Sequence, residues 1–325
     1  MNEFFSTFLL RSGWGGAQVT PLAGDASGRR YWRLIREGGS DDTAILMYIP
    51  KEEIQSFDAF RKIASYLTGL GLSAPAVFSA DPRLGLMVIE DYGDDLVSKL
   101  AQTSAKTETD LYVHAEGVLS KLAKTGAMAG LKLMTPMGMA DMVDIAYDQL
   151  PQDHPVQVDR RDFLAKLAQL CMWKLRGTPV TILRDFHADN LIWLPDRDGV
   201  RRIGLLDFQD ALIGPLGYDL ASLIDDARRS IPEGLRSDLI KRHAKTLSIG
   251  VEDLELRVAL ISVQRNLRIL GIFSRLARDK GKTRYLEHMP RVAALVLRAV
   301  EHAELDHIRE PVTRLVQAHV PEVTA

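Results

Sequence analysis

Three oxygen-bearing side chains lie between residues 185 and 207: the carboxylates of Asp185 and Asp207 and the amide of Asn190. Phosphoryl transfer needs such a set, because one carboxylate must orient or deprotonate the attacking hydroxyl. Hard oxygen ligands must also hold Mg²⁺ against nucleotide phosphates. We therefore predict that Asp185 is catalytic and that Asn190 and Asp207 are metal ligands. The alternative for Asp185 is a surface or helix-capping role.

A predicted β-hairpin positions these groups. Residues 191–194 form a short apolar run with strand character, and residues 202–206 return as a second strand. Between them, residues 195–199 combine Pro, Asp and Gly, as a hairpin loop requires. Because the second strand leads directly to Asp207, we expect all three groups to meet at one end of this small sheet.

The same stretch resembles a known enzyme family. Asp185 and Asn190 have the Asp-x-x-x-x-Asn spacing of the protein-kinase catalytic loop, and Asp207-Phe208-Gln209 stands where Asp-Phe-Gly would come. The stretch continues to Tyr218-Asp219-Leu220-Ala221 and is similar to aminoglycoside phosphotransferases. These enzymes carry His-Gly-Asp-x-His-x-x-Asn, then Ile-Asp-Phe/Trp, then Tyr-Asp-Leu-Ala. The resemblance implies a kinase-like fold, ATP, Mg²⁺ and a small hydroxylated acceptor. Leu183 departs from the histidine of the protein-kinase loop.

Three further segments are similar to one subgroup, the anomeric N-acetylmuramate/N-acetylglucosamine kinases of bacterial cell-wall recycling. That subgroup shares a Gln-Arg-x-Leu-Lys/Arg-x-Leu-Gly-Ile-Phe-x-Arg-Leu run, a Gly-Asp-Ala-Ser loop and an Asp-Phe-Gln-Asp-Ala segment. The corresponding residues are 264–276, 24–27 and 207–211. The resemblance spans nearly the whole chain and implies that an amino-sugar is phosphorylated at its anomeric hydroxyl.

A small-residue loop is predicted to bind the nucleotide phosphates. It lies between a strand at 19–22 and a second strand that ends near residue 35. Residues without bulk let backbone N–H groups approach phosphates closely. A plain turn is the alternative. The residues assigned to nucleotide binding here are Gly24, Asp25, Ala26, Ser27, Gly28 and Arg30.

The next strand, 44–49, has Met47 where a typical kinase has a lysine. The phosphate charge must then be met elsewhere, and a missing strand lysine looks like a trait of the subgroup. Arg29, Arg30 and Arg33 are candidates, with solvated strand-edge charges as the alternative. The acidic residues Glu52, Glu53 and Asp58 are expected to be surface or capping charges.

Strands at 75–78 and 84–89 lead into an acidic, glycine-containing break at 90–95. Kinase-like folds have their hinge at such a break, where backbone groups contact the adenine edge. We therefore predict nucleotide contacts around Glu90 to Tyr92, against the alternative of a solvated linker.

Helical periodicity accounts for most of the remaining chain. We predict an α+β, protein-kinase-like two-lobed fold, with a small antiparallel sheet lobe that includes a helix and a larger, mainly helical lobe. The predicted division is 1–92, the nucleotide-binding lobe, and 93–325, the catalytic and acceptor-binding lobe. The predicted helices are an amphipathic N-terminal helix and segments 54–70, 111–123, 163–175, 235–247, 251–277 and 289–305.

His187, Arg265 and Asn266 are predicted to contact the acceptor. Aminoglycosides are polycations and require an acidic cleft, whereas residues 265–284 are basic and favour an anionic or neutral sugar. His187 could instead brace its loop, and most of the basic residues could simply solvate helices. Asp219 is expected to cap the N-terminus of a helix.

Composition excludes several classes of protein. The 325 residues, 46% hydrophobic and 26% charged, can bury a full core, and a net charge of −2 argues against nucleic-acid binding. The single cysteine, Cys171, suits a reducing cytosol and is expected to be buried on a helix. No apolar run approaches the ~20 residues that span a bilayer, and Glu3 argues against a signal peptide. We expect a cytosolic protein with no membrane contact and no obligate protein partner.

Three hypotheses follow from the sequence. The leading one is an ATP- and Mg²⁺-dependent amino-sugar kinase. The second is a kinase for an aminoglycoside or another small alcohol. The third, prompted by Met47 and Leu183, is a nucleotide-binding pseudokinase without catalysis.

Overall fold

The computed structural model describes residues 3–22, 28–36 and 42–322. The chain divides into two compact units, the first made of residues 1–118 and 189–211 and the second of residues 119–188 and 212–325. The first unit contains an antiparallel sheet with helices, and the second is mostly helical. The predicted lobe boundary between residues 92 and 93 remains a prediction.

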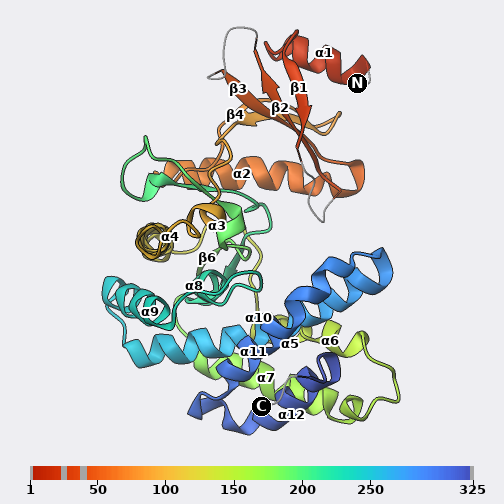
Figure 1. The fold of residues 1–325 in the computed structure, drawn as a ribbon, viewed down its shortest axis with the longest axis vertical. Helices are drawn as coiled ribbons and strands as arrows, with labels where there is room; N and C mark the ends of the chain where they lie inside the picture. Colours follow the sequence, from red (N-terminus) through yellow and green to blue (C-terminus); the bar gives the residue numbers. More distant parts are fainter. Residues whose placement is uncertain (1–2, 23–27, 37–41, 323–325) are drawn as a thin grey trace. The chain divides into compact units, whose positions relative to one another are not determined.

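A five-stranded sheet organises the first unit, in the order β1-β2-β3-β5-β4 (Figure 1). All neighbouring strands are antiparallel, which confirms the strands predicted from the sequence. The middle strand, β3, is buried from Ala44 to Met47, as its apolar sequence requires. The strands are β1 (Gln18–Pro21), β2 (Arg30–Ile35), β3 (Thr43–Tyr48), β4 (Val77–Asp81) and β5 (Leu86–Glu90).

Two helices complete the sheet's core. The first, α1 (Glu3–Arg11), packs Phe8 and Leu9 into the cluster that contains Leu34 and Leu46 of the strands. A short 3₁₀ turn, η1 (Lys51–Glu53), then leads into α2 (Gln55–Gly69). The apolar stripe of α2 is buried, as its spacing of three and four residues predicts. Its buried members are Phe57, Phe60, Ile63, Ala64 and Leu67.

The second unit is built on helices around a two-stranded sheet of β6 (Val180–Ile182) and β9 (Leu212–Gly214). Cys171 is buried on α7, as predicted, and burial raises the pKa of its thiol to about 12. The helix α4 (Ala105–Thr125) contains the division after Val118. The shorter helices are α3 (Val97–Leu100) in the first unit and, in the second, α5 (Pro136–Asp141), α6 (Asp144–Asp148), α7 (Arg160–Lys174), α8 (Tyr218–Ile224) and α9 (Glu233–Leu247).

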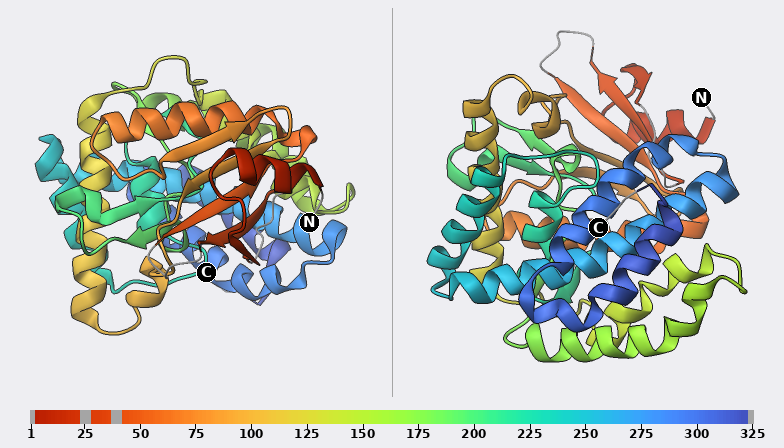
Figure 2. Two further views of the ribbon diagram at one scale, coloured as in Figure 1. Left: turned by 90° about the horizontal axis from the view of Figure 1, so that it is seen from above. Right: turned by 60° about the horizontal axis from the view of Figure 1, so that its bottom comes forward.

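The 30-residue helix α10 (Val251–Lys280) is the longest element of the second unit and packs against α11 (Met289–Val300) (Figure 2). Its Gly271 lies against the backbone of α6, where an added Cβ would be 2.6 Å from the nitrogen of Ala146. The predicted helix 289–305 is wrong at its end, because α11 ends at Val300. A new helix, α12 (Asp306–His319), follows.

Candidate active site

The predicted hairpin is present in the first unit. β7 (Leu191–Trp193) and β8 (Ile203–Leu205) pair antiparallel, with Leu191 opposite Leu205. Beyond that pair, the Leu206 N–H donates to the carbonyl of Asn190 at 3.0 Å. Asn190 therefore precedes one strand and Asp207 follows the other at the same end of the hairpin.

Asp207 has an unusual backbone conformation, with φ of 55°. Non-glycine residues seldom adopt this left-handed region, and such strain is typical of functional sites. Its carboxylate oxygen Oδ1 accepts hydrogen bonds from Gln209 Nε2 at 2.8 Å and from Arg29 at 3.2 Å. The following residue, Phe208, is fully buried and stacks on Phe60 of α2, with ring centroids 4.9 Å apart. This packing fixes the turn that presents Asp207.

A cavity of about 390 Å³ in the first unit gathers four of the predicted site residues. Asn190 and Asp207 line it together with Glu90 and Tyr92, and Ile45 of β3 contributes an apolar wall. A mainly apolar cavity with a few converging polar groups is the usual form of a small-molecule site. The cavity therefore joins the predicted hinge to the predicted metal ligands within one unit.

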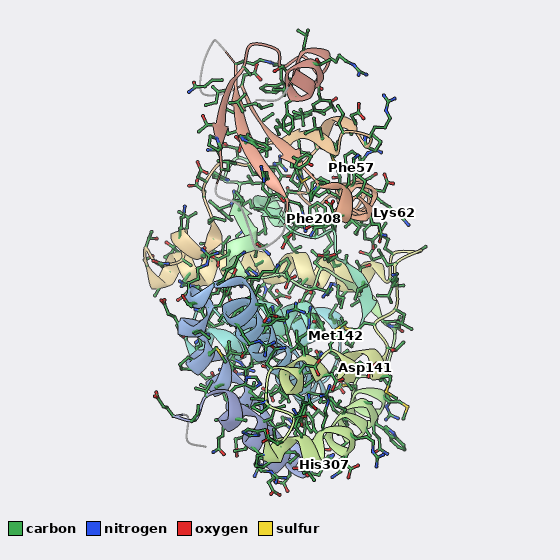
Figure 3. The ribbon with its side chains drawn as sticks, turned by 90° about the vertical axis from the view of Figure 1, so that its right-hand side faces the viewer. Phe57, Lys62, Asp141, Met142, Phe208 and His307 are labelled. Carbon is green, nitrogen blue, oxygen red and sulfur yellow. The ribbon has the colours of Figure 1, made fainter. Side chains whose placement is uncertain are left out.

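Tyr92 is held tightly at this cavity. Its ring lies over Gly204 of β8, where an added Cβ would be 2.7 Å from the ring carbon Cδ2. On the hairpin loop, Arg197 forms an ion pair with Glu90, and its guanidinium carbon lies 4.9 Å from the Tyr92 ring centroid. Burial, with the nearby Glu90 charge, raises the pKa of the Tyr92 hydroxyl. Phe57 and Phe208, both labelled in Figure 3, are buried in the same unit.

The predicted phosphate-binding loop is only partly described. Gly24, Asp25, Ala26 and Ser27 lie outside the described residues. The N–H of Gly28 donates to Glu53 Oε1 at 2.9 Å. Arg30 is exposed at the start of β2, opposite Tyr48, and is not among the residues that line the cavity.

Asp185 belongs to the second unit, where a strained turn presents it. The Asp185 N–H donates to the carbonyl of Leu183 at 2.9 Å, and the intervening Arg184 has φ of 73°. Buried Asp219 holds this turn, because its two carboxylate oxygens accept from the N–H groups of Leu183 at 2.6 Å and Arg184 at 2.8 Å. The meeting of Asp185 with Asn190 and Asp207 stays a prediction.

The predicted capping role of Asp219 is wrong. The residue lies within α8, whose N-cap residue is Gly217, with φ of 96° and no side-chain cap. Burial raises the pKa of Asp219 to about 7, while its two backbone donors and Arg265 act in the opposite direction. A carboxylate can be buried when hydrogen bonds satisfy its oxygens. The Asp219 carboxylate accepts these bonds from the backbone of the turn before Asp185.

Replacing Asp219 with asparagine is expected to lower kcat with little change in ADP affinity. The amide keeps the size but offers one acceptor oxygen, so one N–H of the turn is left buried without its partner. Such a loss costs about 1–3 kcal/mol, which is roughly 10- to 100-fold if expressed in kcat. Ser222→Ala, a buried position on the same helix, is the control. Equal kcat in Asp219→Asn and Ser222→Ala would contradict this role.

A group of basic side chains lies near Asp185 within the second unit. It consists of His187, Arg228, Arg265 and Arg268, named here the His187 cluster. Arg228 contacts His187 Nε2 at 3.2 Å, and because arginine can only donate, this ring nitrogen accepts. Burial lowers the pKa of His187, and Arg228 and Arg265 lower it further. His187 is therefore uncharged near neutral pH, in contact with the guanidinium of Arg228.

Arg265 and Asn266, both predicted acceptor contacts, are buried on α10. Asn266 donates to Ser262 Oγ at 3.0 Å on the same helix. The Arg265 side chain is 5% exposed, and its Nη1 atom has no hydrogen-bond partner among the described residues. Arg265 therefore adds to the His187 cluster a guanidinium with a donor nitrogen, Nη1, that makes no hydrogen bond to the described residues.

The oxygen donors in the first unit suit a hard cation such as Mg²⁺. Asn190 and Asp207 offer an amide and a carboxylate at one cavity, and Mg²⁺ is commonly held by one or two such groups together with substrate phosphates. Over the part of the chain that the structure describes, no group of three or more His, Cys, Asp or Glu is placed to hold a metal ion.

The class of protein follows from a comparison with known families. Residues 18–253 match the phosphotransferase enzyme family known as APH, and the chain belongs to this family. The predicted resemblance is thus confirmed, and the chain is a small-molecule phosphotransferase with an α+β, protein-kinase-like fold.

Individual relatives narrow this class. An N-acetylmuramate/N-acetylglucosamine kinase of Caulobacter vibrioides is 32% identical over 330 residues, covering 88% of this chain and 89% of the relative. A protein of the same description from Pseudomonas aeruginosa is 29% identical and covers 92% and 91%. Among solved structures, a choline/ethanolamine kinase family protein from Mesorhizobium loti has a TM-score of 0.65 at 15% identity and covers 96% and 98%.

Within the described residues, no helix is both long enough and apolar enough to span a bilayer.

Proposed function

We propose that this chain transfers the γ-phosphate of ATP to the anomeric hydroxyl of N-acetylmuramate or N-acetylglucosamine. The observation that carries the proposal is the pairing of Asn190 and Asp207 at the end of one hairpin and in one cavity, in a chain of the phosphotransferase family. The choice of acceptor rests on the relatives described as N-acetylmuramate/N-acetylglucosamine kinases.

In this proposal Asp185 orients the acceptor hydroxyl and takes its proton. The hydroxyl oxygen forms a bond to the γ-phosphorus, the bond from that phosphorus to the β–γ bridging oxygen breaks, and ADP leaves with the electron pair. Asp219 acts through the backbone, because its carboxylate holds the N–H groups of Leu183 and Arg184 before Asp185. Such positioning is the main protein contribution to phosphoryl transfer.

The cavity of the first unit would hold the nucleotide. Its apolar wall at Ile45 suits a purine base, and the hinge residues Glu90 to Tyr92 lie at the same cavity. Asn190 and Asp207 would ligate Mg²⁺, which when bound neutralises phosphate charge. The reaction consumes ATP, and we accordingly place the protein in the cytosol, with nucleotide and sugar as its partners.

The His187 cluster supports an anionic acceptor. Guanidinium groups beside a neutral histidine form a positive environment that suits a carboxylate. N-acetylmuramate carries a lactyl carboxylate that N-acetylglucosamine lacks, so we expect N-acetylmuramate to have the higher kcat/KM. A polycationic aminoglycoside would be repelled by the same groups.

An acceptor panel tests this proposal. Radiolabelled ATP is offered with N-acetylmuramate, N-acetylglucosamine, kanamycin, choline and homoserine, and we expect labelled product from the two amino-sugars. The methyl glycoside of N-acetylglucosamine is the matched control, because its anomeric oxygen is blocked. Turnover of kanamycin alone would overturn the acceptor, and phosphorylation of the methyl glycoside would overturn the anomeric position.

Buried Met47, in place of a strand lysine, favours a second candidate, a nucleotide-binding pseudokinase. Tight ATP binding, no phosphoryl transfer to any acceptor and no effect of Asp185→Asn would support it over the kinase.

A further inference from the structure

The face of β3 that meets the nucleotide cavity carries no charge. Ile45 lines the cavity, and Met47 lies two residues further on the same face of the strand, 1% exposed. A kinase places its phosphate-binding lysine on this strand. The positive charge at this position must therefore come from another element.

Arg29 lies next to this position. Tyr31 of β2 is opposite Met47 and also lines the cavity, and Arg29 is two residues before Tyr31. The guanidinium of Arg29 forms ion pairs with Asp207 at 3.2 Å and with Glu53 at 3.8 Å, and its side chain is 10% exposed. In a kinase, the strand lysine likewise lies near the metal-binding aspartate.

Glu53 also lies near Arg29, in an ion pair at 3.8 Å. The same carboxylate accepts the Gly28 N–H at 2.9 Å, so it joins the end of the small-residue loop to the start of α2. The glycine permits this approach, because an added Cβ would be 2.9 Å from Glu53 Oε1. Glu53, which was expected to be a surface or capping charge, is partly exposed and also contacts Gly28 and Arg29.

The other two arginines are placed differently. Arg33 lines the cavity, whereas Arg29 is not among its lining residues. The Arg33 guanidinium, however, makes four hydrogen bonds with the carboxylates of Asp91 and Asp94, at 2.7 to 3.2 Å, which offset its charge. Arg30 is exposed at the start of β2. Of the three arginines, Arg29 is the one that contacts Asp207.

The ion pair between Arg29 and Asp207 affects the charge balance of the cavity. Without a metal, the guanidinium of Arg29 offsets the carboxylate of Asp207. When a divalent cation occupies Asp207, the Arg29 charge adds to that of the metal, and a nearby anion is required to balance both. Nucleotide phosphates are such an anion, and guanidinium groups bind them with charge-assisted hydrogen bonds.

We propose that Arg29 is the phosphate-binding cation of this chain and performs the function of the absent strand lysine. The inference rests on the proposed function in taking a nucleotide as the ligand of the cavity. It extends that function by assigning the contact with the α- and β-phosphates, which a kinase gives to its strand lysine, to a residue before β2.

Nucleotide binding tests this inference without turnover. Dissociation constants for ADP, ATP and adenosine are measured by calorimetry, with and without Mg²⁺, in the full chain and in Arg29→Met. We expect ADP and ATP to bind about 10- to 100-fold more weakly in the variant, because a hydrogen bond to a charged group is worth about 1.5–3 kcal/mol. Adenosine, which has no phosphate, should bind equally to both.

Three further variants sharpen the result. Arg61→Met is the matched control, since Arg61 also pairs with an acidic residue, Asp58, but on the exposed side of α2. It should bind ADP as the wild type does. Arg29→Lys should retain most of the affinity, and Met47→Lys on the Arg29→Met background should restore part of it by moving the charge to the strand.

Unchanged ADP binding in Arg29→Met would overturn the inference, and so would an equal loss for adenosine, which would mean that the cavity itself had collapsed. If the wild type phosphorylates no acceptor while Arg29→Met still loses ADP affinity selectively, the proposed function fails and the inference stands. If the wild type phosphorylates an amino-sugar and Arg29→Met binds nucleotides normally, the inference fails alone.

Discussion

Replacing Asp185 with asparagine is expected to lower kcat for N-acetylmuramate by about 100- to 10,000-fold, the usual contribution of a general base. Asparagine keeps the size and the N–H that donates to Leu183, so the strained turn and the contacts of Asp219 should persist. The variant loses only the carboxylate that is proposed to take the proton. We expect KM for ATP to change little, as measured by ADP release in a coupled assay.

Asp238→Asn is the control for this substitution, because Asp238 is exposed in the middle of α9 in the same unit. It should leave kcat and the melting temperature unchanged. A kcat for Asp185→Asn close to that of this control would remove Asp185 from the reaction.

Replacing Asp207 with asparagine should abolish the effect of Mg²⁺ on nucleotide binding. Asparagine adopts the left-handed backbone of this position readily, and the stacking of Phe208 on Phe60 is untouched. Because the lost carboxylate is a proposed metal ligand, we expect ADP affinity in the presence of Mg²⁺ to fall by at least about 100-fold. Calorimetric titration with and without MgCl₂ measures this directly.

The matched control is Asp198→Asn, the same chemical change in the exposed loop at the other end of the hairpin. Its ADP affinity should rise with Mg²⁺ as in the wild type. A similar rise in Asp207→Asn would show that the metal is bound elsewhere.

The sequence predicts features that depend on local pattern. The turn residues between 195 and 199 mark the hairpin, and its two strands place Asn190 and Asp207 at one end because pairing register is local. The apolar stripe of α2 can also be predicted from the sequence, because its buried residues recur every three or four positions. The family motif then supplies the chemistry of the carboxylates.

The sequence does not predict contacts made by side chains distant along the chain. Asp219 follows Leu183 by 36 positions, and nothing near it indicates that its carboxylate holds a turn instead of capping a helix. Glu53 and Arg29 are likewise joined only when α2 and the start of β2 are folded together. Such residues look like ordinary surface charges when each is considered with its neighbours alone.

Short elements were missed for a different reason. β6 and β9 are three residues each, too short to show alternation of apolar and polar side chains. The equally short β7 and β8 are marked by the turn residues between them, whereas β6 and β9 are about 30 residues apart along the chain. The continuous apolar pattern after Met289 conceals the end of α11 at Val300, and Pro311 obscures α12, in which it lies.

The ring of Tyr92 lies on Gly204, so a larger residue at position 204 would displace the ring and alter how inhibitors bind. The position of the Tyr92 ring at the cavity depends on the absence of one methyl group in β8. An alanine at this position would push the ring, and if the cavity holds the proposed purine, it would reduce the room for bulky purine analogues. Compounds designed to fill this cavity could thus lose potency through a substitution that they never touch.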